Sequence, residues 1–211
     1  MPLSCLVFDC DGVLLDSVPA KTHAFARLAE PYGKDAEERF VRFHMEHGGV
    51  NRFEKFAWFF QNVLGRSITD EESKTWGERF KQFCREELRT CSLIAGAEEV
   101  LRTFYGKMPL FVCSGAPTEE QTSVLTEHGL AQYFTAIYGA PPDKSSLLCQ
   151  LLDRHGLSPK ETLMVGDATT DRAAAEHAGT HFYAVGELLK GCGYPWGPDL
   201  TGLADYVLHW K

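Results

Sequence analysis

Short apolar runs alternate along most of the chain with stretches in which apolar residues recur every three to four positions. A run that is apolar almost throughout predicts a strand buried on both faces, and the longer spacing predicts a helix with one buried face. The predicted strands are residues 3–8, 109–113, 136–138, 163–165, 181–185 and 206–208. The predicted helices in the same part of the chain are residues 97–105, 118–128, 145–155 and 170–178.

The segment between the first two predicted strands has a different pattern. From about residue 18 to residue 90 it contains helical spacing only, in four successive stretches. Phe53, Phe56 and Phe60 form one aromatic stripe, and Thr69 with Glu72 has the sequence of a capping box, which closes the start of a helix. An aromatic stripe of this spacing is more typical of a helical core than of a cofactor site.

The sequence therefore predicts two domains. A Rossmann-like α/β domain, with a parallel sheet covered by helices on both faces, comprises residues 1–16 and 92–211, and a helical domain comprises the inserted residues 17–91. In open parallel sheets, ligands bind beyond the carboxyl ends of the strands. The residues found at those ends are Asp9, Asp11, Ser114, Gly115 and Asp167.

Composition limits the classes of function. Of the 211 residues, 44% are hydrophobic, which is enough for an ordinary core, and the formal net charge of −8 disfavours nucleic acid and anionic membranes as partners. No apolar window approaches the ~18 residues of a membrane span. The first residues, MPLSCLVFDCDG, lack the pattern of a secretory leader. The seven cysteines include no C-x-x-C pair, which favours reduced thiols over disulfides. A cytoplasmic location is expected.

Candidate chemistry begins with Asp9 and Asp11. Side chains two residues apart on extended chain point the same way, so these carboxylates should face one site. Two neighbouring acids resist joint ionisation unless a cation lies between them, which indicates a metal site or an acid/base couple. The structural alternative is a strand that ends in an ordinary Asp-Gly turn.

Later strand ends favour the metal site. Asp167 ends another strand, and Asp171 follows one helical turn later. Such an oxygen-rich acidic set suits a hard divalent ion and predicts Mg²⁺, whereas the absence of histidine and cysteine from these ends argues against zinc.

The remaining polar residues at this edge suit an anion. Ser114 offers a hydroxyl, Gly115 offers an N–H group where a helix begins, and Lys144 precedes another helix close to the same edge. Together with a metal ion, these groups would neutralise the oxygens of a transferring phosphoryl group. No activated serine, Walker loop or G-x-G-x-x-G motif accompanies them.

With these strand-end residues, the chain resembles the haloacid dehalogenase-like (HAD) phosphohydrolase superfamily. Within it, the chain resembles the helical-cap branch of phosphoglycolate phosphatases and β-phosphoglucomutases. The resemblance covers the whole chain, and four motifs carry it in order: Asp9-Cys10-Asp11-Gly12, Cys113-Ser114-Gly115, Lys144, and Gly166-Asp167-Ala168-Thr169-Thr170-Asp171. Val13 replaces the threonine common after the first motif, which removes no proposed catalytic group.

The resemblance implies a role for each motif residue. It makes Asp9 the nucleophile that forms an aspartyl-phosphate, and Asp11 the group that protonates the leaving oxygen and then deprotonates water. It implies that Asp9, the carbonyl of Asp11, Asp167 and Asp171 hold Mg²⁺, with Asp171 binding directly or through water. It implies that Ser114, Gly115 and Lys144 bind the phosphoryl oxygens.

The inserted helices would be the cap that closes over the site and selects the substrate. Gly49-Val50-Asn51-Arg52 is similar to the cap segment of β-phosphoglucomutase, which implies that Arg52 holds a second phosphate; the alternative is a solvated arginine at a helix start. His44 and His47 form H-x-x-H without a third ligand, so metal binding is not expected there.

The leading hypothesis is a Mg²⁺-dependent phosphatase that acts on a small phosphorylated metabolite. The alternative is a phosphosugar mutase, suggested by Arg52. Two non-enzymatic alternatives are a phospho-acceptor signalling protein and a catalytically silent binding protein, and the intact motifs disfavour both. The sequence leaves open whether the chain is a monomer or a weak dimer.

Overall fold

The computed structural model describes residues 2–210, which fall into two compact units. Ser17–Cys91 forms one, called the helical unit below. The described residues before and after it together form the other, called the α/β unit. Each unit has its own hydrophobic core.

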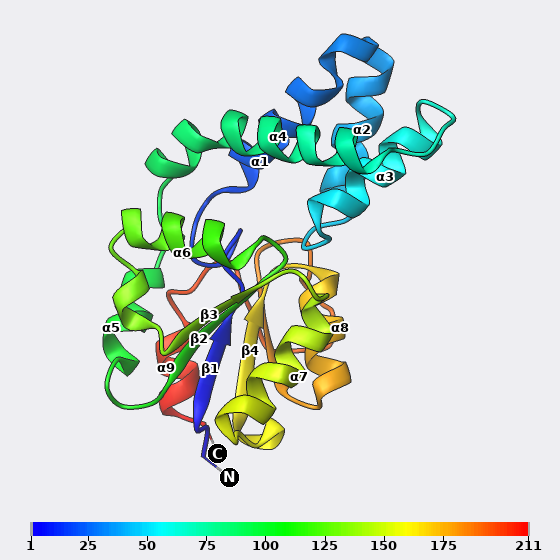
Figure 1. Cartoon of the computed structure of the whole chain (residues 1–211). Coiled ribbons are helices and arrows are strands. Elements are labelled where there is room, and N and C mark those ends of the chain that lie inside the picture. The colour runs from blue at the N-terminus through cyan, green and yellow to red at the C-terminus, as the bar shows by residue number, and fades with distance from the viewer. Residues whose placement is uncertain (1, 211) are drawn as a thin grey trace. The chain divides into compact units, whose positions relative to one another are not determined.

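The α/β unit is built on one parallel sheet (Figure 1). Among the described residues the order of its six strands is β3-β2-β1-β4-β5-β6, and every neighbouring pair is parallel. Their bounds are β1 Cys5–Phe8, β2 Leu110–Ser114, β3 Ala136–Gly139, β4 Thr162–Gly166, β5 His181–Val185 and β6 Trp196–Gly197. All residues of β1, β2 and β4 are buried, which is why these strands are apolar runs in the sequence.

The register of the central strands aligns their carboxyl ends. Phe8, the last residue of β1, pairs with Val112 of β2 and with Val165 of β4. The chain therefore leaves all three strands at the same edge, and Asp9 and Asp167 start from neighbouring positions there. This edge carries the candidate site.

Helices cover both faces of the sheet (Figure 1). Helices α7 (Lys144–His155) and α8 (Thr169–Ala178) pack against each other and onto the face that includes Cys5 and Val7. Leu6 and Phe8 alternate with those residues and are buried on the opposite face. The other helices of the unit are α5 (Ala97–Phe104), α6 (Thr118–Glu127) and α9 (Leu203–Leu208).

The end of the chain differs from the prediction. Residues 206–208 were expected to form a strand but belong to helix α9. Leu203 and Val207, four residues apart, are buried on one side of this helix, while Leu208 is exposed; a short segment cannot distinguish this spacing from a strand. The final strand is instead β6, whose two residues lie in a segment rich in glycine and proline.

The helical unit contains α1 (Val18–Ala29), α2 (Lys34–Glu46), α3 (Arg52–Asn62) and α4 (Asp70–Thr90). Its core is aromatic: the ring of Phe25 lies 5.1 Å from that of Phe40 and 4.6 Å from that of Phe80. Thr69 and Glu72 form the predicted capping box at the start of α4. Of the predicted aromatic stripe, Phe56 and Phe60 are buried in this core, whereas Phe53 is exposed.

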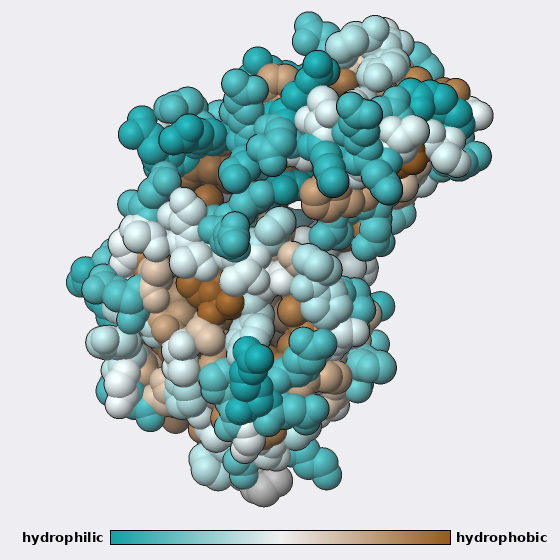
Figure 2. Space-filling model, viewed as in Figure 1, coloured by the Kyte–Doolittle hydropathy of each residue, from teal (hydrophilic) through white to brown (hydrophobic). Residues whose placement is uncertain are grey.

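On the face shown in Figure 2, hydrophilic residues cover most of each unit, and hydrophobic patches are small. No helix in the described part of the chain combines the length and the apolar character needed to cross a membrane.

Candidate active site

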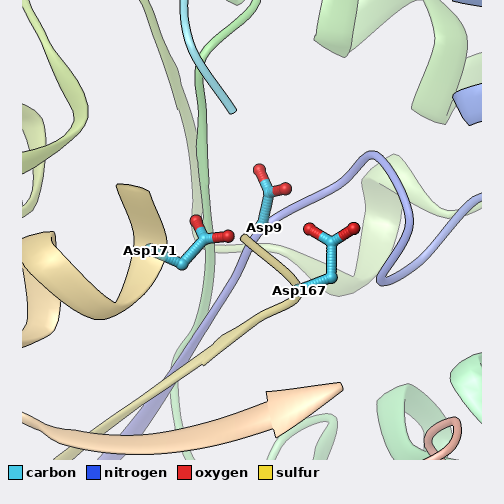
Figure 3. A group of neighbouring side chains, drawn as sticks. All are labelled: Asp9, Asp167 and Asp171. Atoms are coloured by element: carbon cyan, nitrogen blue, oxygen red, sulfur yellow. The ribbon is translucent and has the colours of Figure 1, made fainter. Parts of the chain in front are cut away.

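Three carboxylates meet at the carboxyl edge of the sheet. Asp9 follows β1, Asp167 follows β4, and Asp171 lies in the first turn of α8. One oxygen atom of each lies within 4.8 Å of the others, and Figure 3 shows the three side chains turned toward a common space. Asp9 is only 3% exposed and Asp171 is fully buried, so negative charge is concentrated where little water reaches it.

The ammonium group of Lys144 lies between two of these carboxylates. Its Nζ atom is 3.0 Å from Oδ1 of Asp9 and 2.5 Å from Oδ1 of Asp171. Lys144 is the first residue of α7, and the side chain of Asp143 caps this helix by accepting hydrogen bonds from two backbone N–H groups of its first turn. The cap fixes the start of α7 and thereby the position of Lys144.

Asp171 is held on both sides. Its Oδ1 atom accepts a hydrogen bond from Lys144, and its Oδ2 atom accepts one from the backbone N–H of Ala168 at 2.9 Å. Both oxygens of Asp171 therefore accept hydrogen bonds from the protein, so this carboxylate can hold Lys144 in place. For the same reason it is better suited to contact a metal ion through a water molecule than to bind the ion directly.

Burial and like charges dominate the electrostatics. Burial raises the pKa of Asp9 to about 7, against the opposing attraction of Lys144. Burial, followed by the charges of Asp9 and Asp171, raises the pKa of Asp167 well above its usual range. Burial would lower the pKa of Lys144, but Asp171 and Asp9 outweigh it and hold this pKa well above its usual value. One ammonium group does not balance three carboxylates.

The donor set fits a hard divalent cation. The group formed by Asp9, Asp167 and Asp171 offers only carboxylate oxygens, and oxygen atoms are the ligands that Mg²⁺ prefers. The group contains no nitrogen or sulfur ligand. A cation among these oxygens would also counteract the burial and the like charges that raise the pKa values of Asp9 and Asp167. Asp11, the fourth residue predicted for the metal, was expected to contribute its backbone carbonyl, and its carboxylate is not part of this group.

Asp11 instead faces a residue that the sequence analysis did not single out. Its Oδ2 atom accepts a hydrogen bond of 2.9 Å from Nε2 of Gln121, and the same nitrogen donates to Oγ of Ser114 at 2.8 Å. Gln121 lies on α6 and is 3% exposed. A signal for it exists in the sequence: Gln121 and Leu125 are four residues apart and both buried, so a polar side chain occupies the buried face of a helix.

Ser114 and Gly115 lie where the chain passes from β2 to α6. Ser114 is the last residue of β2 and is fully buried, and its Oγ atom also accepts a hydrogen bond of 3.1 Å from the backbone N–H of Ala116. Gly115 follows it directly, and α6 begins at Thr118. A hydroxyl group and backbone N–H groups at a strand-to-helix junction suit a phosphoryl oxygen.

Arg52 belongs to the helical unit. It is the first residue of α3, and its guanidinium carbon lies 5.2 Å from the ring centre of Phe53 and 5.4 Å from that of Phe80. In the same unit, Nδ1 of His44 lies 3.0 Å from Nζ of Lys55, and Nδ1 of His47 lies 2.9 Å from the carbonyl oxygen of Phe43. These two histidines thus contact different protein groups.

Comparisons with known proteins show which family the chain is similar to. The model of a family described as haloacid dehalogenase-like hydrolase matches residues 6–185, a span that contains every strand end of the site. The chain is 28% identical to a phosphoglycolate phosphatase of Vibrio vulnificus (strain YJ016), over 98% of this chain and 96% of that protein. It is 26% identical to a phosphoglycolate phosphatase of Photobacterium profundum, over 83% and 80% of the two chains.

Solved structures share the fold. A β-phosphoglucomutase from Clostridium difficile superposes with a TM-score of 0.82 at 18% identity, over 98% of this chain and 96% of that chain. A predicted phosphoglycolate phosphatase from Haemophilus somnus 129PT superposes with a TM-score of 0.78 at 19% identity, over 97% of both chains. These similarities, at 18% and 19% identity, show the fold of the chain.

Proposed function

The chain belongs to the haloacid dehalogenase-like hydrolase family, and on that premise we propose that it is a phosphatase that hydrolyses a small phosphorylated metabolite through an aspartyl-phosphate. One observation carries the proposal. The carboxylate of Asp9, at the end of β1, lies in a largely buried cluster with Lys144, Asp167 and Asp171, while Asp11 stands two residues further along with its carboxylate outside that cluster. The two acids at the strand end therefore have different surroundings and can have different roles.

In the first step a carboxylate oxygen of Asp9 attacks phosphorus, and the bond from phosphorus to the substrate oxygen breaks. Asp11 donates its proton to that oxygen, so the substrate leaves as an alcohol. In the second step water attacks phosphorus, Asp11 takes a proton from it, and the bond to Asp9 breaks. Inorganic phosphate leaves, and both carboxyl groups return to their starting states.

The other residues stabilise the charge on the phosphoryl oxygens. Lys144 supplies a buried positive charge next to Asp9, and Asp171 holds the Lys144 side chain in place. Ser114 and the N–H group of Gly115 offer hydrogen bonds from the end of β2. Mg²⁺, held by Asp9, Asp167 and the carbonyl of Asp11, with Asp171 acting through water, would supply further positive charge to the phosphoryl group when bound.

We further propose that residues 17–91 act as a cap and that the substrate carries a second anionic group. The curated relatives named above are phosphoglycolate phosphatases, and phosphoglycolate is a small phosphate ester with a carboxylate. Arg52 is the cap residue assigned to that second group. A protein with a net charge of −8 needs such a local cation to hold an anion. The cytoplasm is the proposed location.

The test is phosphate release from a panel of phosphorylated acids, sugars and nucleotides with Mg²⁺ present. We expect turnover by the unchanged protein and its loss in Asp9→Asn, which keeps the shape of the side chain but removes the nucleophile. Asp153→Asn is the matched control because Asp153 is exposed on α7, and it should retain full activity. Normal turnover by Asp9→Asn would refute the proposal, and conversion of a hexose 1-phosphate to its 6-phosphate without phosphate release would favour a mutase.

A further inference from the structure

Gln121 connects two residues of the candidate site that come from different strands. Its Nε2 atom donates one hydrogen bond to Oδ2 of Asp11 and another to Oγ of Ser114, at 2.9 Å and 2.8 Å. An amide nitrogen carries two hydrogens, so these bonds use the full donor capacity of the group. Gln121 is 3% exposed on α6, so its bond to Ser114 is buried, whereas its bond to the half-buried Asp11 is partly buried.

The orientation of the amide follows from its partners. If the Gln121 side chain were reversed, its oxygen would face the carboxylate of Asp11, and two acceptors without a hydrogen between them repel each other. When Asp11 is ionised, only the orientation with Nε2 toward Asp11 satisfies this contact. The hydrogen-bond network therefore determines the position of both N–H groups.

This arrangement determines the direction of the Ser114 hydroxyl. Its oxygen accepts hydrogen bonds from Gln121 and from the backbone N–H of Ala116, at 2.8 Å and 3.1 Å. A hydroxyl oxygen has two lone pairs, and both are occupied by these donors. The hydroxyl group can therefore act only as a donor, and phosphoryl oxygens are acceptors. Gln121 prepares Ser114 to donate to a phosphoryl group before the substrate arrives.

The same amide orients Asp11. Because Oδ2 accepts from Gln121, protonation of Asp11 as a general acid is favoured at Oδ1. A carboxyl group held through one oxygen by a buried donor rotates less freely than a solvated one. The contact thus selects the proton-carrying oxygen and fixes its direction relative to Ser114.

We propose that Gln121 is a positioning residue for phosphate ester cleavage, which aligns Asp11 for proton transfer to the leaving group and holds the Ser114 hydroxyl as a donor. This role rests on the proposed function, since it presupposes that Asp11 is the acid and that Ser114 binds the phosphoryl group. Gln121 itself exchanges no proton and forms no covalent bond in the reaction.

The decisive variant is Gln121→Met, which has a similar length but no hydrogen-bond donor. It should be compared with the unchanged protein on 4-nitrophenyl phosphate, whose leaving group needs little protonation, and on phenyl phosphate, whose leaving group needs much more. A correctly placed general acid contributes 10²–10⁴-fold, so we expect kcat/KM for phenyl phosphate to fall about tenfold further than kcat/KM for 4-nitrophenyl phosphate. Gln132→Met, at an exposed glutamine of the same unit, should change neither value.

An equal loss of kcat/KM on both substrates would overturn the proposal, because a merely structural effect does not depend on the leaving group. A second measurement does not require activity or a folded Gln121→Met protein. The two side-chain amide protons of Gln121 should give separate signals in ¹H–¹⁵N NMR spectra, one shifted by Asp11→Ala and the other by Ser114→Ala. If neither signal moves, the contacts are absent and the proposal fails. Absence of any turnover by the unchanged protein would instead refute the proposed function, and the NMR result would still decide whether Gln121 makes these contacts.

Discussion

Gly166 and Asp171 pack so closely that a Cβ atom on Gly166 would overlap the Cβ atom of Asp171. Gly166 is the last residue of β4, and Asp171 lies in the first turn of the helix that follows. The absence of a side chain at Gly166 lets α8 start directly against the strand end. This places the Asp171 carboxylate on the ammonium group of Lys144.

We expect Gly166→Ala to remove most of the activity. The added methyl group must displace Asp171, so Lys144 loses the anchor that holds it beside Asp9. Overpacking of this kind costs about 1–3 kcal/mol in the free energy of unfolding. Activity and urea unfolding should be measured together with Gly202→Ala, where the added atom meets only the Tyr183 hydroxyl at 3.8 Å. Equal activity in the two variants would contradict the role assigned to this contact.

The stability of the metal-free protein should fall between about pH 4 and pH 7. Burial raises the pKa of Asp9 to about 7, whereas the unfolded chain releases this proton near pH 4. In that window the folded state binds more protons than the unfolded state, so rising pH favours unfolding. Urea unfolding in the presence of a chelator measures the slope. Asp9→Asn should reduce it, and an unchanged slope in that variant would show that Asp9 does not titrate in this way.

The sequence was sufficient to predict the layout of the α/β fold and the clustering of acidic residues at one edge. Buried parallel strands are apolar throughout, so β1, β2 and β4 are visible as runs, and each run ends at a polar residue. Parallel pairing then brings Asp9 and Asp167 together without further information. The family resemblance of the four motifs supplied the roles of the residues, which no spacing alone provides.

Two features could not be predicted in this way. Strand β6 has only two residues, which is too few to show a repeating pattern of apolar positions. The segment 206–208 is too short for its pattern to distinguish a strand from helix α9. The contact of Gln121 with Asp11 joins residues 110 positions apart, and it depends on how α6 is oriented over the sheet. Helical spacing indicates that Gln121 is on the buried face, but not which atoms it meets.

The capping box of α4 should contribute measurably to the helical unit. The Thr69 hydroxyl accepts from the N–H of Glu72 at 3.2 Å, and the Glu72 carboxylate accepts from the N–H of Thr69 at 3.0 Å. Thr69→Ala removes the first bond and should cost about 1 kcal/mol of unfolding free energy. Thr69→Ser keeps the hydroxyl and is the matched control. Tryptophan fluorescence can follow the transition because Trp76 lies in this core, and equal stability of the two variants would argue against the box.

Removal of one carboxylate from the buried cluster should have opposite effects with and without Mg²⁺. Burial and the charges of Asp9 and Asp171 raise the pKa of Asp167, which means that its ionised form is unfavourable in the metal-free protein. Asp167→Asn keeps the shape and removes the charge, so the metal-free variant should have a higher Tm than the unchanged protein near pH 7.5. Mg²⁺ at 100 times its Kd should then stabilise the unchanged protein by about 2.7 kcal/mol and the variant by much less, because a ligand is missing. The order of the two Tm values should therefore reverse when Mg²⁺ is added, and thermal unfolding with chelator or with Mg²⁺ measures it.

Asp153→Asn, at an exposed site on α7, is the control and should follow the unchanged protein in both conditions. An equal rise of Tm with Mg²⁺ in Asp167→Asn would show that Asp167 does not hold the ion.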